Sequence, residues 1–468
     1  MILVAVAALA IVIQDHTPLR AAPRASASEL VSLWQGELLE IRGQNAGYLR
    51  VYDYHRERGG YLRSEAVRTV AFTPADAPEL LAVLRFLRDT PGSEALGISY
   101  GAAYLRAAPA GTPVAEAFDA IARMAERLAE RASGSGAAVA QATAQLDVVE
   151  QFGIHTRNFE RNGRIGVCYD GELFRRVLVH PGAGPEERAH AALALTRPDC
   201  IDPDLSPAVR SALDDERGKL LEAIPDRSLS DMTRGRLDLR RATVWAAIAF
   251  EQSRNGKPPA AAAQRALAAL NAVAAGQLGE DRRAEYLDAI VRVGAIRWAA
   301  ATLPPPTGAL VLKASAGDPG QTCVVLARTA PGKDDVPLLH RCTYGVVWMA
   351  SAQCIAQGRA LVVAVQPLES WRELWVFHAI ADSWSIDVLS PGADDPQEGY
   401  LEFAGFVPGT QRLLIARELK EHGRFRRTFE ELRLDDLVLM RLASAPDRLP
   451  DFVRWQDAQW RRDTLALH

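Results

Sequence analysis

The first 70 residues alternate apolar and polar side chains in short runs, which predicts strands separated by turns. Residues 11–13 are an apolar run, residues 37–41 are apolar with acidic neighbours, and residues 48–52 alternate at period two before a glycine pair. These runs are too short for helices, and turn residues separate them. We therefore expect a small β-barrel domain over residues 11–71.

This segment resembles the bacterial SH3 (SH3b) domain in the order of its anchor residues. The anchors are residues 19–23 in a first arm, Leu33 and Gly36-Glu37 before a strand, and then the steps Tyr48-x-x-Val51 and Gly60-Tyr61-Leu62. The family commonly has Trp where this chain has Tyr48 and Tyr61. The resemblance covers about an eighth of the chain. It implies an SH3-like barrel whose groove binds extended peptides or peptidoglycan stems.

Aromatic residues are the candidate ligand contacts of this domain. We expect Tyr48 and Tyr61 to be half-buried in the barrel. Tyr52 and Tyr54 are two residues apart, so alternation along one strand puts them on the same face. With Trp34 they are the predicted groove residues, because flat side chains with polar tips suit peptide recognition.

From residue 74 the apolar side chains follow the three-and-four spacing of helices. Residues 114–132 carry such a stripe, with Glu and Arg opposite. We expect a mainly helical domain over 74–301. A plain bundle is favoured, since one helix pair of tetratricopeptide type is too few for a solenoid. Arg161-Asn162-Gly163 predicts the turn of a β-hairpin near 153–170.

Consecutive prolines after residue 302 mark a linker, which we place at 302–321. Residues 322–445 predict an antiparallel β-domain with two rounds of four short strands. This spacing resembles β-propeller blades, with Pro408-Gly409 at a blade turn, but two rounds are too few to close a ring. We expect a twisted sheet, or a sandwich of two blade-like sheets.

Two predictions concern the end of the chain. The cluster Arg424-Phe425-Arg426-Arg427 predicts a hairpin face whose ion-pair partners are Glu430 and Glu431. Residues 446–468 predict a closing amphipathic helix, with Phe452, Trp455 and Trp460 on its apolar side.

The composition is that of a globular protein with several domains. The chain has 468 residues, of which 48% are hydrophobic and 24% charged. A chain of this length is expected to form about two to four domains. The order of the predicted segments makes the fold class multidomain α+β. The formal net charge of -4 offers no basic field, so nucleic acid is not an expected partner.

The first ten residues are apolar and end in Ala8-Leu9-Ala10, which resembles the cleavage end of a secretory signal peptide. No Lys or Arg precedes Arg20, so we interpret residues 1–10 as an N-terminally truncated signal segment. The alternative is a buried first strand that continues into residues 11–13. The apolar run breaks at Gln14-Asp15, short of the about 20 residues that a membrane span needs. We expect a periplasmic or otherwise exported protein.

The five cysteines fit an exported protein with two bridges. We expect bridges between Cys168 and Cys200 and between Cys323 and Cys342, with Cys354 free. A bridge between Cys342 and Cys354 is the rival pairing. In a cytosolic protein, five reduced and buried thiols are expected instead.

Common catalytic patterns are incomplete in this sequence. The run from Gly97 to Gly101 around Ser99 matches the nucleophile elbow, but no buried strand precedes it, so we expect a helix packed closely through its small residues. Cys168 lies in a predicted strand with no preceding Asp, unlike the Cys-His peptidases that often accompany SH3b domains. Motifs for zinc, calcium and phosphate are missing as well. We therefore predict no catalytic residues, metal or cofactor.

The whole arrangement resembles uncharacterised proteobacterial periplasmic proteins with an SH3 domain. The leading hypothesis is a non-catalytic envelope binding or scaffolding protein, whose SH3b domain engages cell-wall peptide or a protein partner. One alternative is a cell-wall hydrolase of unrecognised type that uses Ser99 or Cys168. The other is a cytosolic interaction protein.

Overall fold

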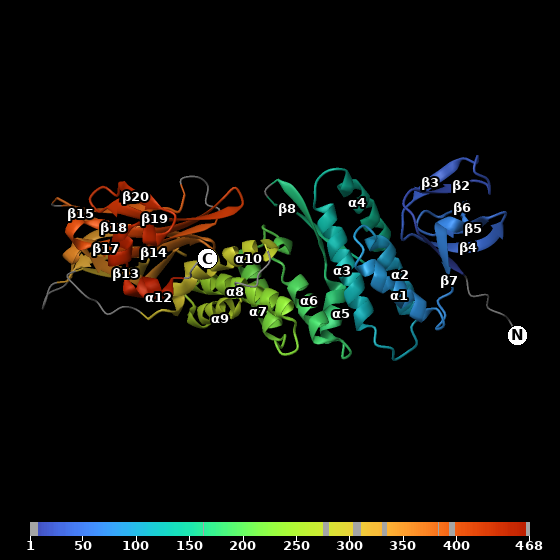
Figure 1. Ribbon diagram of the computed structural model, residues 1–468, viewed down its shortest axis with the longest axis horizontal. Coiled ribbons are helices and arrows are strands. Elements are labelled where there is room, and N and C mark those ends of the chain that lie inside the picture. Colours follow the sequence, from blue (N-terminus) through green and yellow to red (C-terminus); the bar gives the residue numbers. More distant parts are fainter. Residues whose placement is uncertain are drawn as a thin grey trace. The chain divides into compact units, whose positions relative to one another are not determined.

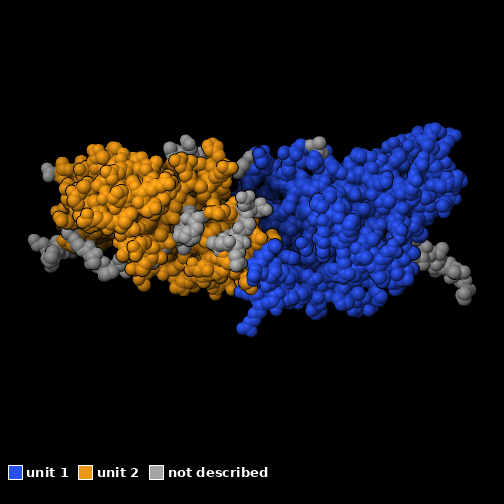
Figure 2. Space-filling view, in the orientation of Figure 1, with its two compact units in different colours: residues 1–206, 223–233 blue, residues 207–222, 234–468 orange. Residues whose placement is uncertain are grey.

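The computed structural model describes residues 8–161, 163–274, 280–302, 310–329, 335–381, 383–392 and 398–464. The chain forms two compact units (Figure 2), and the helical stretch contributes to both. Unit 1 comprises residues 1–206 and 223–233, and unit 2 comprises residues 207–222 and 234–468. Residues 1–7 of the signal-like segment and 303–309 of the predicted linker lie outside the described residues.

Unit 1 begins with a seven-stranded antiparallel sheet (Figure 1). Its strands are β1 (Leu9–Val12), β2 (Thr17–Arg20), β3 (Glu29–Leu33), β4 (Leu38–Asn45), β5 (Tyr48–Asp53), β6 (Arg58–Arg63) and β7 (Val67–Val70). They lie in the order β3-β2-β6-β5-β4-β1-β7. Because β3 and β7 are the two edges and do not pair with each other, the closed barrel that we expected is not found.

The inner face of this sheet is apolar, as the alternation predicts. Leu19, Leu49 and Leu62 are buried there together with neighbouring Leu and Val side chains. Gly60 faces the same interior, and a Cβ on it would lie 2.6 Å from Cγ of Leu19. The glycine therefore lets strands β2 and β6 approach each other, since a larger residue would displace the core. Of the two tyrosines predicted to be half-buried, Tyr61 is half-buried, whereas the prediction is wrong for Tyr48, which is buried.

Strand β1 lies inside the sheet. Ala10 pairs with Leu39 of β4 on one side and with Thr69 of β7 on the other. Ala10, Ile11 and Val12 are fully buried. The buried first strand that the sequence offered as the alternative is therefore present, and the signal-like segment 1–10 overlaps it at its last two residues.

Helices form most of the remainder of unit 1. They are α1 (Ala77–Arg88), α2 (Glu94–Ala107), α3 (Ala115–Ala132), α4 (Ala137–Glu150), α5 (Glu172–Val179) and α6 (Pro185–Leu195). The predicted hairpin is confirmed as β8 (Thr156–Arg161) and β9 (Arg164–Tyr169), although Asn162 of its turn lies outside the described residues. Gly97 and Gly101 of α2 face α3, and a Cβ on Gly101 would lie 2.5 Å from Cγ1 of Ile121. The predicted close packing through small residues is confirmed.

Unit 2 starts with helices and continues with two sheets. Its helices are α7 (Pro207–Glu222), α8 (Asp231–Arg254, from residue 234 in unit 2), α9 (Ala260–Ala272), α10 (Glu280–Ile296) and the short 3₁₀ helix η4 (Arg297–Ala300). A three-stranded sheet consists of β10 (Leu310–Ala316), β11 (Thr322–Arg328) and β12 (Val336–Thr343). Strand β10 occupies part of the predicted linker 302–321, where an apolar start, Leu310-Val311-Leu312, pairs with β11.

The second sheet of unit 2 has eight strands (Figure 1). They are β13 (Val346–Ile355), β14 (Ala360–Leu368), β15 (Trp371–Ile380), β16 (Ser383–Leu389), β17 (Gly399–Val407), β18 (Arg412–Glu421), β19 (Arg424–Arg433) and β20 (Leu439–Ala443). Strands β13–β16 and β17–β20 are two antiparallel groups of four, joined by a short parallel pairing of β15 with β17. The two predicted rounds of four strands are present, and no closed propeller is found in the described part of the chain.

A buried charge cluster joins this sheet to the helices of unit 2. Oε1 of Glu402 lies 3.1 Å from Nη2 of Arg372 and 3.1 Å from Nε of Arg297. Its Oε2 accepts hydrogen bonds from Nε1 of Trp460 and Oγ1 of Thr464, both at 2.7 Å. Burial opposes ionisation of Glu402, but the attraction of Arg297 and Arg372 outweighs it and holds the pKa at about 2. Glu402 is therefore a charged anchor inside unit 2.

The prediction of one continuous C-terminal helix is wrong. Two short helices, α11 (Pro450–Trp455) and α12 (Ala458–Asp463), replace it. The break forms because Gln456 pairs with Gly405 of β17 and Asp457 caps α12 by accepting a hydrogen bond from the Trp460 amide. Phe452 and Trp460 are buried as predicted, whereas Trp455 is exposed.

Candidate binding surfaces

Tyr52 and Tyr54 lie together on the outer face of the unit 1 sheet. Their ring centres are 5.0 Å apart and their planes meet at 76°. The guanidinium of Arg42 lies 3.8 Å from the centre of the Tyr52 ring and 6.0 Å from that of Tyr54. Glu40 accepts hydrogen bonds from Nε of Arg42 at 2.8 Å and from the Tyr54 hydroxyl at 3.0 Å. We call these four residues the tyrosine face.

The local strand geometry builds the tyrosine face. Glu40 on β4 is directly opposite Tyr52 on β5, and Tyr52 is opposite Gly59 on β6. A Cβ on Gly59 would lie 3.8 Å from Cδ2 of Tyr52, so the ring lies over the space that this glycine leaves. Arg42 stands at the irregularity of β4 between Ile41 and Gly43, which sets it over the ring. Of the four side chains, that of Tyr54 is 64% exposed.

Hydrogen bonds within the tyrosine face hold its charged groups in place before a ligand binds. The hydrogen bonds that Arg42 and Tyr54 donate lower the pKa of Glu40, so its carboxylate stays ionised and holds Arg42 in place. Arg50 points to the same side as Tyr52, two residues away on β5, and is exposed. Within the described residues Arg50 has no ion-pair partner. The surface around the tyrosines therefore offers a positive charge to a ligand.

Trp34, the third predicted groove residue, lies elsewhere. Its ring centre is 4.4 Å from that of His16. It lines a small cavity of about 80 Å³ with Asp53, which points inward from β5 while Tyr52 points outward. Arg56 crosses this cavity to Asp53 at 2.8 Å and to Glu37 at 2.7 Å. The space has room for a few waters rather than a peptide. The structure thus brings Tyr52 and Tyr54 together and separates Trp34 from them.

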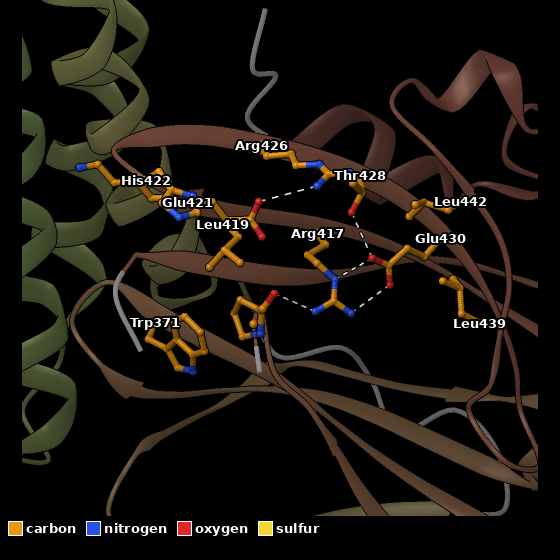
Figure 3. A pocket seen from close by; sticks show the side chains of 13 residues that line it. Trp371, Arg417, Leu419, Glu421, His422, Arg426, Thr428, Glu430, Leu439 and Leu442 are labelled. Carbon is orange, nitrogen blue, oxygen red and sulfur yellow. Dashed lines mark hydrogen bonds and ion pairs between the residues drawn. The ribbon is translucent and has the colours of Figure 1, made fainter. Parts of the chain in front are cut away.

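Unit 2 contains a larger pocket of about 590 Å³ on the β18–β19 side of its eight-stranded sheet (Figure 3). Its lining mixes apolar and charged side chains, namely Trp371, Pro391, Gly392, Arg417, Leu419, Lys420, Glu421, His422, Arg426, Thr428, Glu430, Leu439 and Leu442. This volume is in the range of small-molecule sites. The sequence did not reveal the pocket because its residues come from four separated stretches of the chain.

Two cationic side chains of this pocket, Arg417 and Lys420, already have partners within unit 2. Arg417 donates from Nε to Glu430 at 2.6 Å (Figure 3). Its Nη1 donates to the carbonyl oxygens of Ser390 and Pro391. Lys420 lies 2.6 Å from Glu398. Because Arg417 and Lys420 are satisfied within the protein, neither supplies a free positive charge to a ligand here.

The residues considered for catalysis are bound in structural contacts. Ser99 is buried inside α2, and its hydroxyl donates to the carbonyl oxygens of Gly36 at 2.5 Å and Ala95 at 3.1 Å. Gly36 approaches α2 so closely that a Cβ on it would lie 2.6 Å from the Ala95 oxygen. Ser99 therefore fastens the sheet to α2, and no elbow exists there.

The cysteine pairs are those that the sequence predicted. Cys168 is bonded to Cys200 and Cys323 to Cys342, while Cys354 is free and half-buried. Burial raises the pKa of the Cys354 thiol, which keeps it protonated and unreactive. The rival pairing of Cys342 with Cys354 does not occur. With its sulfur in a bridge, Cys168 has no thiolate to act as a nucleophile.

The predicted partners of the arginine cluster on β19 are wrong. Arg426 lies 3.7 Å from Glu421 and Arg427 lies 3.9 Å from Glu418, both across the β18–β19 hairpin. Glu430 and Glu431 instead pair with Arg417 and Arg412 of β18. The reason is the register, in which Ala416 is opposite Phe429 and the acidic residues of β19 face the basic residues of β18 at a diagonal.

Comparisons with protein-family models, with curated proteins and with solved structures gave no match. None of the helices in the described ranges combines the length and apolar character that a bilayer span requires. Function must therefore be inferred from the side chains and their arrangement.

Proposed function

We propose that this protein is a non-catalytic binding protein of the bacterial cell envelope, whose unit 1 sheet engages a cell-wall peptide. The observation that carries the proposal is the tyrosine face. Two tyrosines in contact, one of them largely exposed, stand beside an arginine that a carboxylate holds in place. Rigid aromatic side chains with polar tips bind at low entropic cost, which suits recognition of an extended peptide.

The charges favour an anionic ligand. Arg42 is fixed over Tyr52, and the exposed Arg50 lies on the same face of β5. Stem peptides of cell walls are short, extended and carry free carboxylates. A carboxylate of the ligand can receive hydrogen bonds from these guanidinium groups while its backbone lies on the Tyr54 ring.

The cysteines support an exported location. Two cysteine pairs lie at bonding distance, one in each unit. Bridges of this kind persist in oxidising compartments such as the periplasm and are rare in the cytosol. They favour the envelope over a cytosolic interaction protein, and the engagement of Ser99 and Cys168 in structural contacts leaves the hydrolase alternative without its named residues.

A sedimentation assay with purified peptidoglycan sacculi tests the proposal. The wild-type protein is expected to sediment with the sacculi, and Tyr52→Ala/Tyr54→Ala is expected to stay in the supernatant. Tyr344→Ala is the matched control, because this tyrosine is 58% exposed but lies in unit 2. Retention of the double variant on the sacculi would remove the tyrosine face from the proposal. Failure of the wild type to sediment would remove the cell-wall ligand.

A further inference from the structure

Cys323, His340 and Cys342 form a cluster of metal-ligating side chains on the three-stranded sheet of unit 2. Cys323 on β11 is directly opposite Cys342 on β12. His340 precedes Cys342 by two residues, so both side chains point to the same face of β12. Nε2 of His340 lies 3.3 Å from Sγ of Cys342, and the three ligand atoms lie within 4.8 Å of one another.

The surroundings of the cluster are closed on one side and open on the other. Cys323 is buried, and Oε1 of Gln321 lies 3.8 Å from its sulfur. The backbone at Gly317 comes so near that a Cβ there would lie 2.8 Å from the same sulfur. Cys342 is half-buried and His340 is exposed, which leaves an approach from solvent. A small reductant or an ion can therefore reach the cluster from the His340 side.

Reduction changes the chemistry of this cluster. In the bridged state the two sulfurs are bonded to each other, and the imidazole is the remaining metal ligand. Two thiolates and one imidazole are a soft donor set of the kind that selects Zn(II) and Cu(I). The β11–β12 pairing extends beyond the bridge, with Val324 opposite Arg341 and Leu326 opposite Leu339, so backbone contacts other than the sulfur bond also hold the three donors on neighbouring strands.

We propose that Cys323, Cys342 and His340 form a binding site for a soft metal ion, open when the Cys323–Cys342 bridge is reduced and closed when it is oxidised. The reductant is a dithiol, which passes two electrons and two protons to the bridge and becomes a disulfide itself. The bridge thereby becomes two thiols. Metal binding then releases the two thiol protons, and the imidazole nitrogen joins as the third ligand.

The arrangement explains why a histidine stands beside this bridge. A bridge with a structural role alone needs only its two cysteines. His340 contributes a donor whose Nε2 is already directed at the sulfur of Cys342. With three protein ligands, a fourth coordination position of Zn(II) stays available to solvent or to a further ligand.

The test uses the full chain, reduced with a dithiol and desalted without oxygen, and titrated with Zn(II) or Cu(I) against a chromophoric chelator. One equivalent of metal is expected to bind. Cys323→Ser/Cys342→Ser is expected to abolish binding, and His340→Ala to weaken it by at least about tenfold. Cys168→Ser/Cys200→Ser is the matched control, since it removes the other bridge and should bind as the wild type does.

Three results would overturn the proposal. One is a bridge that a dithiol cannot reduce while the protein stays folded. Another is equal binding by the wild type and by Cys323→Ser/Cys342→Ser. The third is equal binding by the wild type and by His340→Ala, with His55→Ala as a control for loss of an exposed histidine in unit 1.

Discussion

The guanidinium of Arg42 lies 3.8 Å from the ring centre of Tyr52, and Glu40 holds it there by a hydrogen bond of 2.8 Å. This contact gives the tyrosine face both its rigidity and part of its positive charge. Replacing Arg42 with Ala is expected to weaken binding of an anionic stem peptide by about two- to fivefold, a small effect because solvent screens an exposed charge of this kind. Calorimetric titration of a soluble muropeptide measures the effect.

Repeating the titration at several salt concentrations separates the contribution of charge to the affinity from that of shape. Binding by the wild type should weaken as salt is added, since exposed charges are screened, and binding by Arg42→Ala should depend less on salt. Arg63→Ala is a suitable control, because Arg63 is exposed on β6, which β5 separates from the strand of Arg42, and pairs with Glu65. Equal affinity and equal salt dependence in wild type and Arg42→Ala would show that Arg42 takes no part.

The buried Glu402 predicts a large loss of stability on mutation. Glu402→Gln leaves Arg372 and Arg297 buried without their counter-charge, so the free energy of unfolding should fall by about 3–5 kcal/mol. Urea unfolding followed by tryptophan fluorescence reports it, since Trp460 donates a hydrogen bond to Glu402. Glu65→Gln, at an exposed ion pair, should lower the free energy of unfolding by less than about 1 kcal/mol. Similar values for both variants would contradict the anchoring role.

Glu418 predicts a pH dependence of stability. Burial raises its pKa to about 7, and the attraction of Arg427 only partly opposes this. The native state therefore keeps the Glu418 proton to a higher pH than the unfolded chain does. The stabilisation is full below the unfolded pKa, near 4.5, and is lost as pH rises through about 7.

Glu418→Gln isolates this contribution. Between pH 4.5 and pH 8 the wild type should lose roughly 2–3 kcal/mol more stability than the variant does, because the amide does not titrate. Unfolding free energies measured across this range, in the same buffer and salt, give the difference. Parallel pH profiles for the two proteins would show that Glu418 ionises normally in the native state.

The Cys168–Cys200 bridge is expected to stabilise the protein by restricting the conformations of the unfolded chain. It spans 32 residues, and closing such a loop stabilises the native state by about 3–4 kcal/mol on the chain-entropy model. Cys168→Ser/Cys200→Ser should lower the unfolding free energy by this amount without changing the far-ultraviolet spectrum. In native material, mass mapping without reductant should recover one peptide pair joined through these cysteines. Free thiols at both positions would argue for a reducing compartment.

Local patterns predicted the elements whose causes are local. The period-two alternation around Tyr48 and Tyr52 predicted β5, and the helical spacing in residues 114–132 predicted α3. The glycines around Ser99 predicted a closely packed helix. The cysteine pairs were predicted from their positions, because Cys168 and Cys200 flank one helix-rich stretch and Cys323 and Cys342 lie on successive predicted strands.

The features that the sequence did not predict depend on contacts between distant residues. The prediction of one continuous C-terminal helix was wrong because Gly405, about 50 residues earlier, pairs with Gln456 and interrupts the helix. Trp34 does not join Tyr52 because it lines a cavity with Asp53, whose side chain lies on the opposite face of β5 from that of Tyr52. The large pocket in unit 2 and the alignment of His340 with two cysteines depend on strand register, which no single run of residues fixes.

The affinity of the protein for a soluble stem peptide tests the central claim most directly. We expect calorimetric titration to give one binding site per wild-type chain. Tyr52→Ala/Tyr54→Ala should weaken it by more than about 30-fold, as loss of an aromatic hot spot does, and Tyr344→Ala should leave it unchanged. An unchanged affinity of the double variant, with its fold intact, would contradict the account.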